Sequence, residues 1–560
     1  MTYPNPSTAL AAVLVDEMIR GGVRRVVASP GSRSTALLLA FAGRPEIDLK
    51  MHIDERSAAF RALGLSLATG EPVAVLTTSG SAAANLLPAV VEAERSMIPL
   101  VVITADRPAV MVRRRVNQTT DHLAIFKGFA RAQVGLEAPS DGVDGNAVWR
   151  DSVARAVSSA VGGENPPGPV HLNVPFEEPT LPVGDDGRSR SAPYQFECSG
   201  ADAGQPWFIP QEGPSMVVPE LPDLGDRVLL AIGHGDFDAA LVGQAARTTG
   251  VAVLATSRSG VRGGGVVNGY HHVLVDGFPL DLNPTGVIVV GDLNPADRIL
   301  ASIPTGAPVV HVDRWGIFSD PFGSMTLGVK GTPDSVIALV GPQRDGWSQS
   351  WLEADSVMRA STRAYLDSLT ELSGTGLAST LDLVEWEALV VASSLAARDV
   401  DAHLERHGPV FSNRGVSGID GFVSTAVGVG TIYRRTVAYT GDLAFIYDSN
   451  GFLGEDLPGI VFLVMDNNGG GLFDLLPQAK LAPDFERLFV TPPNRRLSLL
   501  AAFHGLSYVE AETPADVLAA IESGFLESGP TVVRVAVDRD GDVRVRHELD
   551  RLARQTRSNI

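Results

Sequence analysis

The chain has 560 residues, which exceeds the size of a single hydrophobic core and predicts two to four domains. Hydrophobic residues make up 44% of it and charged residues 20%, a composition typical of globular proteins. With 45 Lys and Arg against 65 Asp and Glu, the net charge is −20, which argues against nucleic acid or an anionic membrane as a partner. Any anionic ligand must therefore be held by local arginines.

Membrane and secretion signals are not evident. No apolar run approaches the roughly 20 residues that a membrane helix needs, and the N-terminal stretch lacks the basic region of a signal peptide. A single cysteine, Cys198, excludes an intramolecular disulfide framework and a cysteine metal cluster. These features favour a cytoplasmic enzyme.

Short apolar strands alternate with helical patterns in three parts of the chain, which is typical of parallel βαβ sheets. We predict a first α/β domain over residues 1–185, with strands at RRVVAS, LKMHID, PVAVLTTSG, PLVVITA and PVHLNVP. Residues 186–225 are rich in Pro, Gly and Ser and are predicted to form a linker.

A central, Rossmann-like domain is predicted over residues 226–345, with strands at RVLLAIGHG, VAVLATS, GVIVVGD and PVVHVD. A polar helical connector, residues 346–385, leads to a third domain over residues 386–560, with strands at PVFSN, RTVAYTGD, GIVFLVMDNN, LSYVEAE and TVVRVAVD. We therefore expect an α/β fold with three doubly wound parallel-sheet domains. Ligands of such sheets bind beyond the carboxyl ends of the strands, so we expect the functional residues there.

Oxygen-bearing side chains follow two strands of the third domain. Asp442 stands in TGDL and Asn467 in MDNNGGG, and a right-handed crossover would bring both to the same end of adjacent parallel strands. With a backbone carbonyl near Gly469, they offer three hard oxygen ligands that suit Mg²⁺ or Ca²⁺ and a substrate phosphate. From the spacing alone, helix-capping residues on two βα turns are an equal alternative.

Glu55 provides the second feature, because it follows MHID and begins a long apolar helix. A carboxylate in the first turn of a helix is usually a solvated cap. This one lies at an equivalent strand end of a different domain from Asp442. A glutamate in one α/β domain and a metal–diphosphate site in another is the layout of thiamine diphosphate enzymes.

The segments GDL and DNNGG resemble the GDG…NN motif of those enzymes. SPGSRST, IDERSAAF, TTSGSAAANLLPAVVEA, NQT and SNRGVSGIDGFVSTAVG are similar to one branch, the 2-succinyl-5-enolpyruvyl-6-hydroxy-3-cyclohexene-1-carboxylate (SEPHCHC) synthases of menaquinone biosynthesis. The resemblance covers residues of about 7–180 and 386–500 and is weak in the middle block and in the last sixty residues. It implies three domains of the thiamine diphosphate-enzyme type.

That resemblance implies a transferase that decarboxylates 2-oxoglutarate and adds the resulting succinic semialdehyde–thiamine adduct 1,4 to isochorismate. The implied cofactors are thiamine diphosphate and Mg²⁺ (or Mn²⁺), held between the first domain of one subunit and the third domain of another. A homodimer or homotetramer follows from that arrangement, with no nucleic acid and no membrane insertion.

The same resemblance assigns roles to residues of the cofactor site. Glu55 would hydrogen-bond the pyrimidine N1′, and Ile419 would prop the bent cofactor. Asp442, Asn467 and the carbonyl of Gly469 would bind the metal. The alternatives to Asn467 are its neighbours Asp466 and Asn468. The other implied cofactor contacts are Gly31, Ser79, Ser417, Gly418, Gly441 and Leu443.

Both implied substrates carry several carboxylates, which guanidinium groups pair with bidentately. The family pattern matches Arg33, Arg107, Arg398 and Arg414 as catalytic or substrate-binding cations, and Ser32, Asn117, Gln118 and Ser394 as further polar contacts. Leu472 and Phe473 match an apolar wall over the reacting centre. Where the family often has a basic pair in the middle block, NPADRIL offers only Arg298.

Three other hypotheses are compatible with the sequence. One is a different thiamine diphosphate-dependent 2-oxoacid decarboxylase or an acetolactate-type synthase, against which the arginines argue, because a small apolar acceptor needs fewer cations. Another is a nucleotide-binding regulatory or structural protein, against which Glu55, Asp442 and Asn467 speak together. The third is a working enzyme whose middle block is a separate effector-binding module.

Overall fold

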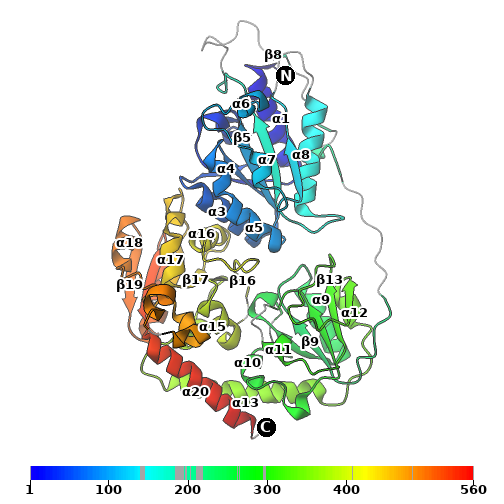
Figure 1. Ribbon diagram of the computed structural model, residues 1–560, viewed down its shortest axis with the longest axis vertical. Helices are drawn as coiled ribbons and strands as arrows, with labels where there is room; N and C mark the ends of the chain where they lie inside the picture. Colours follow the sequence, from blue (N-terminus) through cyan, green and yellow to red (C-terminus); the bar gives the residue numbers. More distant parts are fainter. Residues whose placement is uncertain are drawn as a thin grey trace.

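The computed structural model describes residues 2–138, 145–182, 194–195, 199–201, 204–209, 219–261, 263, 265–293, 298–406, 408–481 and 483–558. Within them lie three six-stranded sheets, each flanked by helices, and Figure 1 shows the corresponding three lobes. All strand pairs of these sheets are parallel, which confirms the predicted fold of three α/β domains of the thiamine diphosphate-enzyme type. The predicted domain boundaries stay predictions. Cys198 and much of the predicted linker lie outside the described residues.

The first sheet has the strand order β3-β2-β4-β5-β7-β6. Ala74 and Leu76 of β4 pack against α1, α2 and α8, while Val73 and Val75 pack on the opposite face against α3 and α5, as the two-residue period of a strand requires. The strands are β2 (Arg25–Ala28), β3 (Asp48–Met51), β4 (Val73–Thr77), β5 (Leu100–Asp106), β6 (Ala132–Gly135) and β7 (Val170–Pro175), and the helices are α1 (Pro6–Arg20), α2 (Thr35–Ala42), α3 (Glu55–Thr69), α4 (Ser81–Asn85), α5 (Leu87–Arg95), α6 (Ala109–Arg113), α7 (His122–Ile125) and α8 (Asn146–Val161), with a short β1 (Thr2–Tyr3) paired to β8 (Tyr194–Gln195).

The central sheet has the order β11-β10-β9-β12-β13-β14. Its strands are β9 (Val228–Ile232), β10 (Ala252–Ala255), β11 (Val266–Val267), β12 (Gly286–Val290), β13 (Val309–Asp313) and β14 (Leu327–Lys330), and its helices are α9 (Ala239–Thr249), α10 (Tyr270–Val273), α11 (Arg298–Ser302), α12 (Pro333–Ile337) and α13 (Trp347–Asp367), with a 3-10 turn η3 (Ser257–Ser259) after β10. Trp351 of α13 is fully buried against this sheet, so the helical connector is part of the central core.

The third sheet has the order β16-β15-β17-β18-β20-β19. Its strands are β15 (Ala388–Val391), β16 (Val410–Phe411), β17 (Thr436–Gly441), β18 (Ile460–Asp466), β19 (Ser507–Ala511) and β20 (Thr531–Ala536), and its helices are α14 (Gly374–Thr380), α15 (Leu395–His403), α16 (Phe422–Ile432), α17 (Asp442–Tyr447), α18 (Leu497–Phe503), α19 (Pro514–Gly524) and α20 (Arg539–Arg557), with short turns η6 (Ser449–Leu453) and η7 (Gly471–Leu475). Ala553 of α20 reaches the core of the central domain, where α20 lies along α13 (Figure 1).

Helices α3 and α16 join the first and third domains. A Cβ on Gly64 would lie 2.2 Å from the carbonyl oxygen of Thr425, so only glycine permits this approach of the two helices. Arg61 of α3, fully buried, donates to the carbonyls of Glu455 and Asp456 at 2.8 and 3.2 Å. The carboxyl-end loops of the two sheets are thereby fixed relative to each other.

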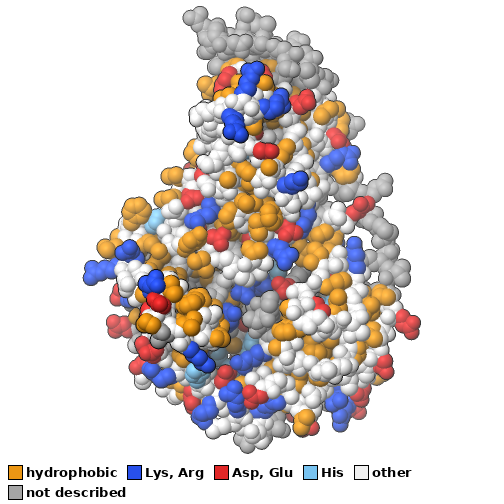
Figure 2. All heavy atoms as spheres, in the orientation of Figure 1, with side chains coloured by type: hydrophobic (Ala, Val, Ile, Leu, Met, Phe, Trp, Pro, Cys, Tyr) orange, Lys and Arg blue, Asp and Glu red, His pale blue; other side chains and the backbone are white. Residues whose placement is uncertain are grey.

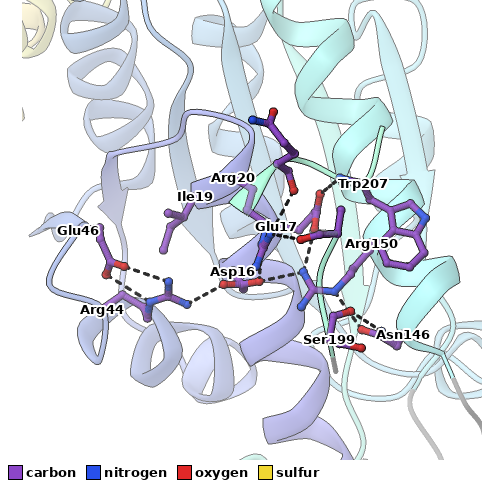
Figure 3. A network of polar contacts seen from close by, with 12 residues as sticks. Asp16, Glu17, Ile19, Arg20, Arg44, Glu46, Asn146, Arg150, Ser199 and Trp207 are labelled. Atoms are coloured by element: carbon purple, nitrogen blue, oxygen red, sulfur yellow. Dashed lines mark hydrogen bonds and ion pairs between the residues drawn. The ribbon is translucent and has the colours of Figure 1, made fainter. Parts of the chain in front are cut away.

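A buried ionic network joins α1 to α8 on the face of the first sheet opposite α3 and α5 (Figure 3). Arg150 donates to Asp16 at 2.9 Å and to Glu17 at 2.8 Å, and the backbone amide of Trp207 donates to Glu17 as well. Burial opposes ionisation of Asp16, but the hydrogen bonds from Arg20 and Arg150 outweigh it and lower the pKa of that carboxyl. The network therefore also ties residues 204–209 to the first domain.

In the part of the chain that the structure describes, every helix is too short or too polar to cross a membrane.

Candidate active site

Asp442 and Asn467 emerge at one edge of the third sheet. Strands β17 and β18 are adjacent and parallel, with Gly441 opposite Met465, so both side chains follow at their carboxyl ends. Asp442 is 2% exposed and Asn467 is 9% exposed. Asp442 Oδ2 and Asn467 Oδ1 are buried and lack a hydrogen-bond partner among the described residues. Two buried oxygens without a donor are a combination that a bound cation would relieve.

The side chains of Asp466 and Asn468, the neighbours of Asn467, form hydrogen bonds with other residues. Asp466 accepts from Arg534 Nε at 2.6 Å and from the backbone amide of Asn468 at 3.2 Å. The Asn468 side chain pairs with Asn494, donating at 3.0 Å and accepting at 3.1 Å. Both residues therefore hold the turn that carries Asn467.

Gly469 lies in the same turn with a φ of +135°. A Cβ there would lie 2.5 Å from the carbonyl oxygen of Val490, so a larger residue would clash as well as strain the backbone. Leu472 and Phe473 follow in η7, where both are half-buried and the Phe473 ring lies 5.6 Å from that of Phe489.

The electrostatics of this edge of the third sheet also favour a bound cation. Burial, and then the negative charge of Asp466, raise the pKa of Asp442 to about 7, while backbone amides of Leu443 and Gly469 offset part of the rise. An uncompensated carboxylate is therefore costly here, and a divalent cation would make its ionised form favourable. The potential ligand set mixes one carboxylate, one amide and a carbonyl. No group of three or more His, Cys, Asp or Glu suited to a metal occurs among the described residues.

Glu55 begins α3, behind the N-cap residue Asp54. It is half-buried, and its Oε2 accepts from Asn85 Nδ2 at 3.4 Å. Within one chain, no hydrogen bond or ion pair of the described residues links Glu55 to Asp442. Three large apolar side chains in these regions are exposed. They are Ile53, two residues before Glu55, at 69%, and Val416 and Ile419, on the loop after β16, at 48% and 41%.

A polar cluster occupies the carboxyl edge of the first sheet. Arg33 is buried, donates to the carbonyl of Phe176 at 3.0 Å and pairs with Glu178. Burial lowers the pKa of Arg33, and the positive charge of Arg107 contributes to this lowering. Arg107 Nε donates to the carbonyl of Asn117 at 2.9 Å.

Gln118 and Ser79 lock together in the same cluster. Gln118 Nε2 donates to the Ser79 carbonyl at 3.0 Å, and Ser79 Oγ donates to the Gln118 carbonyl at 2.9 Å. Gly31 packs on Thr78, where a Cβ would come within 2.3 Å, and Ser32 is exposed beside it. The structure thus brings most of the predicted residues of the first domain together.

The third domain contributes a second group of predicted residues. Ser394, at a φ of +76°, precedes α15, and its carbonyl accepts from Arg398 Nη1 at 2.8 Å. Arg414 follows β16, with Ser417, Gly418 and Ile419 on the same loop. Ser417 is exposed, and a Cβ on Gly418 would meet Asp420 Oδ1 at 2.1 Å.

Arg298, from the central domain, is engaged at both ends of its guanidinium. It donates to the carbonyl of His271 at 2.6 Å and pairs with Asp550 of α20 at 3.0 Å. Its predicted substrate contact stays a prediction.

Two residues near these loops, the buried Glu92 and the half-buried Arg258, were not among the predicted ones. Glu92 of α5 accepts the backbone amides of Gly415 and Val416. Arg258, in η3 of the central domain, lines one cavity with Arg414. Glu92 lies within TTSGSAAANLLPAVVEA, but the resemblance assigns it no role, and no motif marks Arg258. Each residue acquires its role through packing between domains.

Comparison with known proteins agrees with this arrangement. Residues 8–125 match the family model of the thiamine pyrophosphate enzyme N-terminal TPP binding domain. The chain is 35% identical over 588 residues to a protein of Roseiflexus sp. (strain RS-1), covering 98% of each chain. It is 37% identical over 583 residues to a protein of Thermobifida fusca (strain YX), covering 97% of this chain and 98% of the relative. A protein of Geobacillus kaustophilus (strain HTA426) is 34% identical over 96% of each chain. All three relatives carry the name 2-succinyl-5-enolpyruvyl-6-hydroxy-3-cyclohexene-1-carboxylate synthase.

Proposed function

Because the chain belongs to the SEPHCHC synthases, thiamine diphosphate-dependent carboligases of menaquinone biosynthesis, we propose that it decarboxylates 2-oxoglutarate and adds the remaining four-carbon unit to isochorismate. As a member of that family it is a transferase. We propose that it acts in the cytoplasm.

We propose that Asp442, Asn467 and the carbonyl of Gly469 hold Mg²⁺ or Mn²⁺. The two orphaned buried oxygens, Asp442 Oδ2 and Asn467 Oδ1, fit a hard cation. The engagement of Asp466 by Arg534 and of Asn468 by Asn494 favours Asn467 over its neighbours. Gly441, Leu443, Ser417 and Gly418 would line the diphosphate and its surroundings, and Gly31 and Ser79 would contact the cofactor from the first domain.

Thiamine diphosphate, when bound, supplies a thiazolium carbon that attacks a 2-oxo acid and accepts the electron pair left by carbon dioxide. Glu55 would share a proton with the pyrimidine N1′, which is the general acid/base role that a half-buried carboxyl can fill. Ile419 would support the bent cofactor, and Leu472 and Phe473 would keep water from the reacting centre.

We propose that each active site combines two subunits of a homodimer or homotetramer. Glu55 is not bonded to Asp442 within one chain, and Ile53, Val416 and Ile419 expose large apolar surfaces beside the two half-sites. Apolar surface of this kind is covered favourably by a partner subunit. A second copy would bring its Glu55 to the metal site of the first.

Charge and hydrogen-bonding groups suited to multiply charged substrates surround these half-sites. Arg33, Arg107, Arg398 and Arg414 would bind carboxylates bidentately, with Ser32, Asn117, Gln118 and Ser394 completing the hydrogen bonds. Burial of Arg33 and Arg414 strengthens such pairing, since water competes less for a half-desolvated ion.

One observation carries the proposal: buried donor-free oxygens on Asp442 and Asn467 in one domain, with a strand-end Glu55 in another, within a chain of this family. The test is to follow 2-oxoglutarate in the presence of thiamine diphosphate and Mg²⁺. We expect rapid consumption only when isochorismate is present. Equal turnover of pyruvate, or ligation to pyruvate, would instead assign a decarboxylase or an acetolactate-type synthase.

A further inference from the structure

A narrow cavity lies where the central and third domains meet at the carboxyl ends of their strands. The central domain contributes Ser257 and Arg258 of η3, and the third domain contributes Asp401 of α15, Ser412 and Arg414. Figure 1 shows α15 and β16 on the side of the third domain that faces the central lobe, and Figure 2 shows basic side chains gathered along the furrow between these lobes. The cavity volume is about 20 Å³, little more than one water-sized group occupies by that measure.

Two arginines, Arg258 and Arg414, line this cavity together with Asp292 and Asp401, and Arg398 lies near Arg414. The pKa of Arg414 is lowered to about 10, first by burial and then by the positive charges of Arg258 and Arg398. Among the described residues, the guanidinium groups of Arg258 and Arg414 make no hydrogen bond and no ion pair. The negative charges of Asp292 and Asp401 offset part of the lowering of the pKa of both arginines. Half-buried guanidinium groups that still lack an ion-pair partner are the pattern of a site completed by an anion.

Asp401 holds the turn that carries Arg258. Asp401 Oδ1 accepts from the backbone amide of Ser257 at 2.5 Å, and Oδ2 accepts from Tyr270 Oη at 3.0 Å and His271 Nε2 at 3.2 Å. Asp401 lies three residues after Arg398 on α15, so the two side chains share one face of that helix. Helix α15 therefore carries Arg398 and, through Asp401, fixes the turn of the central domain that carries Arg258.

We propose that Arg258 is a substrate-binding residue that, with Arg398 and Arg414, receives the distal carboxylate of the 2-oxo acid substrate. This inference rests on the proposed function. A cavity of this volume admits the terminal carboxylate of an unbranched chain, such as that of 2-oxoglutarate, but not a substituted ring such as isochorismate. Arg258 also supplies a cation from the central domain, whereas Arg298 of the same domain is paired with Asp550.

Specificity follows from the same geometry. A monocarboxylic 2-oxo acid would leave the guanidinium groups of Arg258 and Arg414 without an ion-pair partner. A site built to bind a charged group discriminates strongly against substrates that lack it, because its buried polar groups are then left unpaired. Arg258 would thus help to select a five-carbon dicarboxylate over pyruvate or 2-oxobutanoate.

The test compares Arg258→Ala and Arg258→Lys with Arg247→Ala, a matched control on the exposed face of α9 in the same domain. We expect Arg258→Ala to raise the KM for 2-oxoglutarate on the order of ten- to a hundredfold, the loss of a charge-assisted hydrogen bond. The KM for isochorismate should stay within about twofold, as should both constants in Arg247→Ala. The preference for 2-oxoglutarate over 2-oxobutanoate, as a ratio of kcat/KM, should fall by a similar factor, with Arg258→Lys intermediate because ammonium cannot pair bidentately.

Calorimetric titration of the holoenzyme with glutarate, an unreactive dicarboxylate, separates this inference from the proposed function. If the wild-type protein does not turn over 2-oxoglutarate, the proposed function fails, while weaker glutarate binding by Arg258→Ala still supports the anion site. Unchanged glutarate affinity and unchanged KM for 2-oxoglutarate in a folded Arg258→Ala protein would overturn the inference, as would an effect confined to isochorismate. If Arg258→Ala does not fold, the Lys variant decides by the same two measurements.

Discussion

The carboxylate of Glu92, in the first domain, accepts the backbone amide of Gly415, in the third domain, at 2.8 Å. The same oxygen, Oε1, accepts from Ser96 Oγ at 2.7 Å, and the other, Oε2, accepts from the amide of Val416 at 2.9 Å. Glu92 is 2% exposed, so the charge is buried and depends on these three donors. The loop that carries Arg414 and Ile419 is therefore anchored by a residue of another domain.

Replacing Glu92 should loosen that loop. In Glu92→Gln, one backbone amide faces an NH₂ group instead of an acceptor, and we expect about a tenfold loss in kcat/KM together with a loss of about 1 to 3 kcal/mol in stability. Steady-state kinetics and urea unfolding measure the two effects. Glu94→Gln is the control, because Glu94 pairs with Arg131 inside the first domain, and its kinetics should not change. Wild-type kinetics for Glu92→Gln would rule out the anchoring role.

The pKa of Asp442, raised to about 7 by burial and by Asp466, predicts a pH-dependent metal site. Between pH 3.8, the ordinary pKa of an aspartate, and about pH 7, the folded metal-free protein keeps a proton on Asp442 that the unfolded chain has lost. This group therefore stabilises the metal-free fold at low pH, and its contribution is lost as the pH rises towards about 7. Metal binding needs the carboxylate, so Mg²⁺ affinity should fall by up to about tenfold per pH unit below about 7.

Mg²⁺ titrations at fixed thiamine diphosphate, in two buffers of different ionisation enthalpy, measure both the affinity and the proton released on binding. Proton release should be largest on the acid side of about pH 7 and small on the alkaline side. Asp456→Asn, a change at an exposed partner of Lys50, should leave the profile as it is. An Mg²⁺ affinity that is flat across this range would contradict the assignment of Asp442.

The two adjacent asparagines should respond differently to substitution. Asn467→Ala removes a buried oxygen that faces the metal edge, so we expect a loss of Mg²⁺ affinity of at least about tenfold with little change in unfolding. Asn468→Ala removes the contact to Asn494 and should behave like Asn494→Ala, with a stability cost of about 1 kcal/mol and a smaller effect on Mg²⁺. If Asn468→Ala alone abolished Mg²⁺ binding, the ligand assignment would move to Asn468.

The buried network of Figure 3 should dominate the local stability of the first domain. Arg150→Met leaves Asp16 and Glu17 without their shared partner, and Glu17 is fully buried, so we expect a loss of about 3 to 5 kcal/mol. Arg155→Met, which breaks an exposed pair with Asp151 on the same helix, should cost at most about 1 kcal/mol. Hydrogen exchange of the α1 and α8 amides reports this locally. Similar exchange in the two variants would exclude a central role for the network.

Much of the fold could be predicted because its buried strands are short apolar runs bounded by turn residues. GVIVVGD and TVVRVAVD, for example, coincide with β12 and β20. Strand β15 was missed, because ALVV runs without a break into the helical pattern of α15. The short strands β11 and β14 were missed as well, since two to four residues carry too little periodicity.

The site could be predicted in part, for a different reason. Glu55, Asp442 and Arg414 stand in recognisable segments at strand ends, so spacing and resemblance identify them. Glu92 also stands in such a segment, but there it is a polar position on an amphipathic helix, and its contact with the third domain arises only when that domain packs on α5. Arg258 sits in an unremarkable turn, and its meeting with Arg414 depends on how two domains dock.

Substitution of Glu55 tests the central claim most directly. Glu55→Gln keeps the size of the side chain but cannot exchange a proton with the cofactor, so thiamine diphosphate and Mg²⁺ should bind within about tenfold of the wild-type affinity. Consumption of 2-oxoglutarate in the presence of isochorismate should fall at least about a hundredfold, in line with the loss of a general acid/base. A Glu55→Gln protein that binds both cofactors and turns over at the wild-type rate would contradict the account.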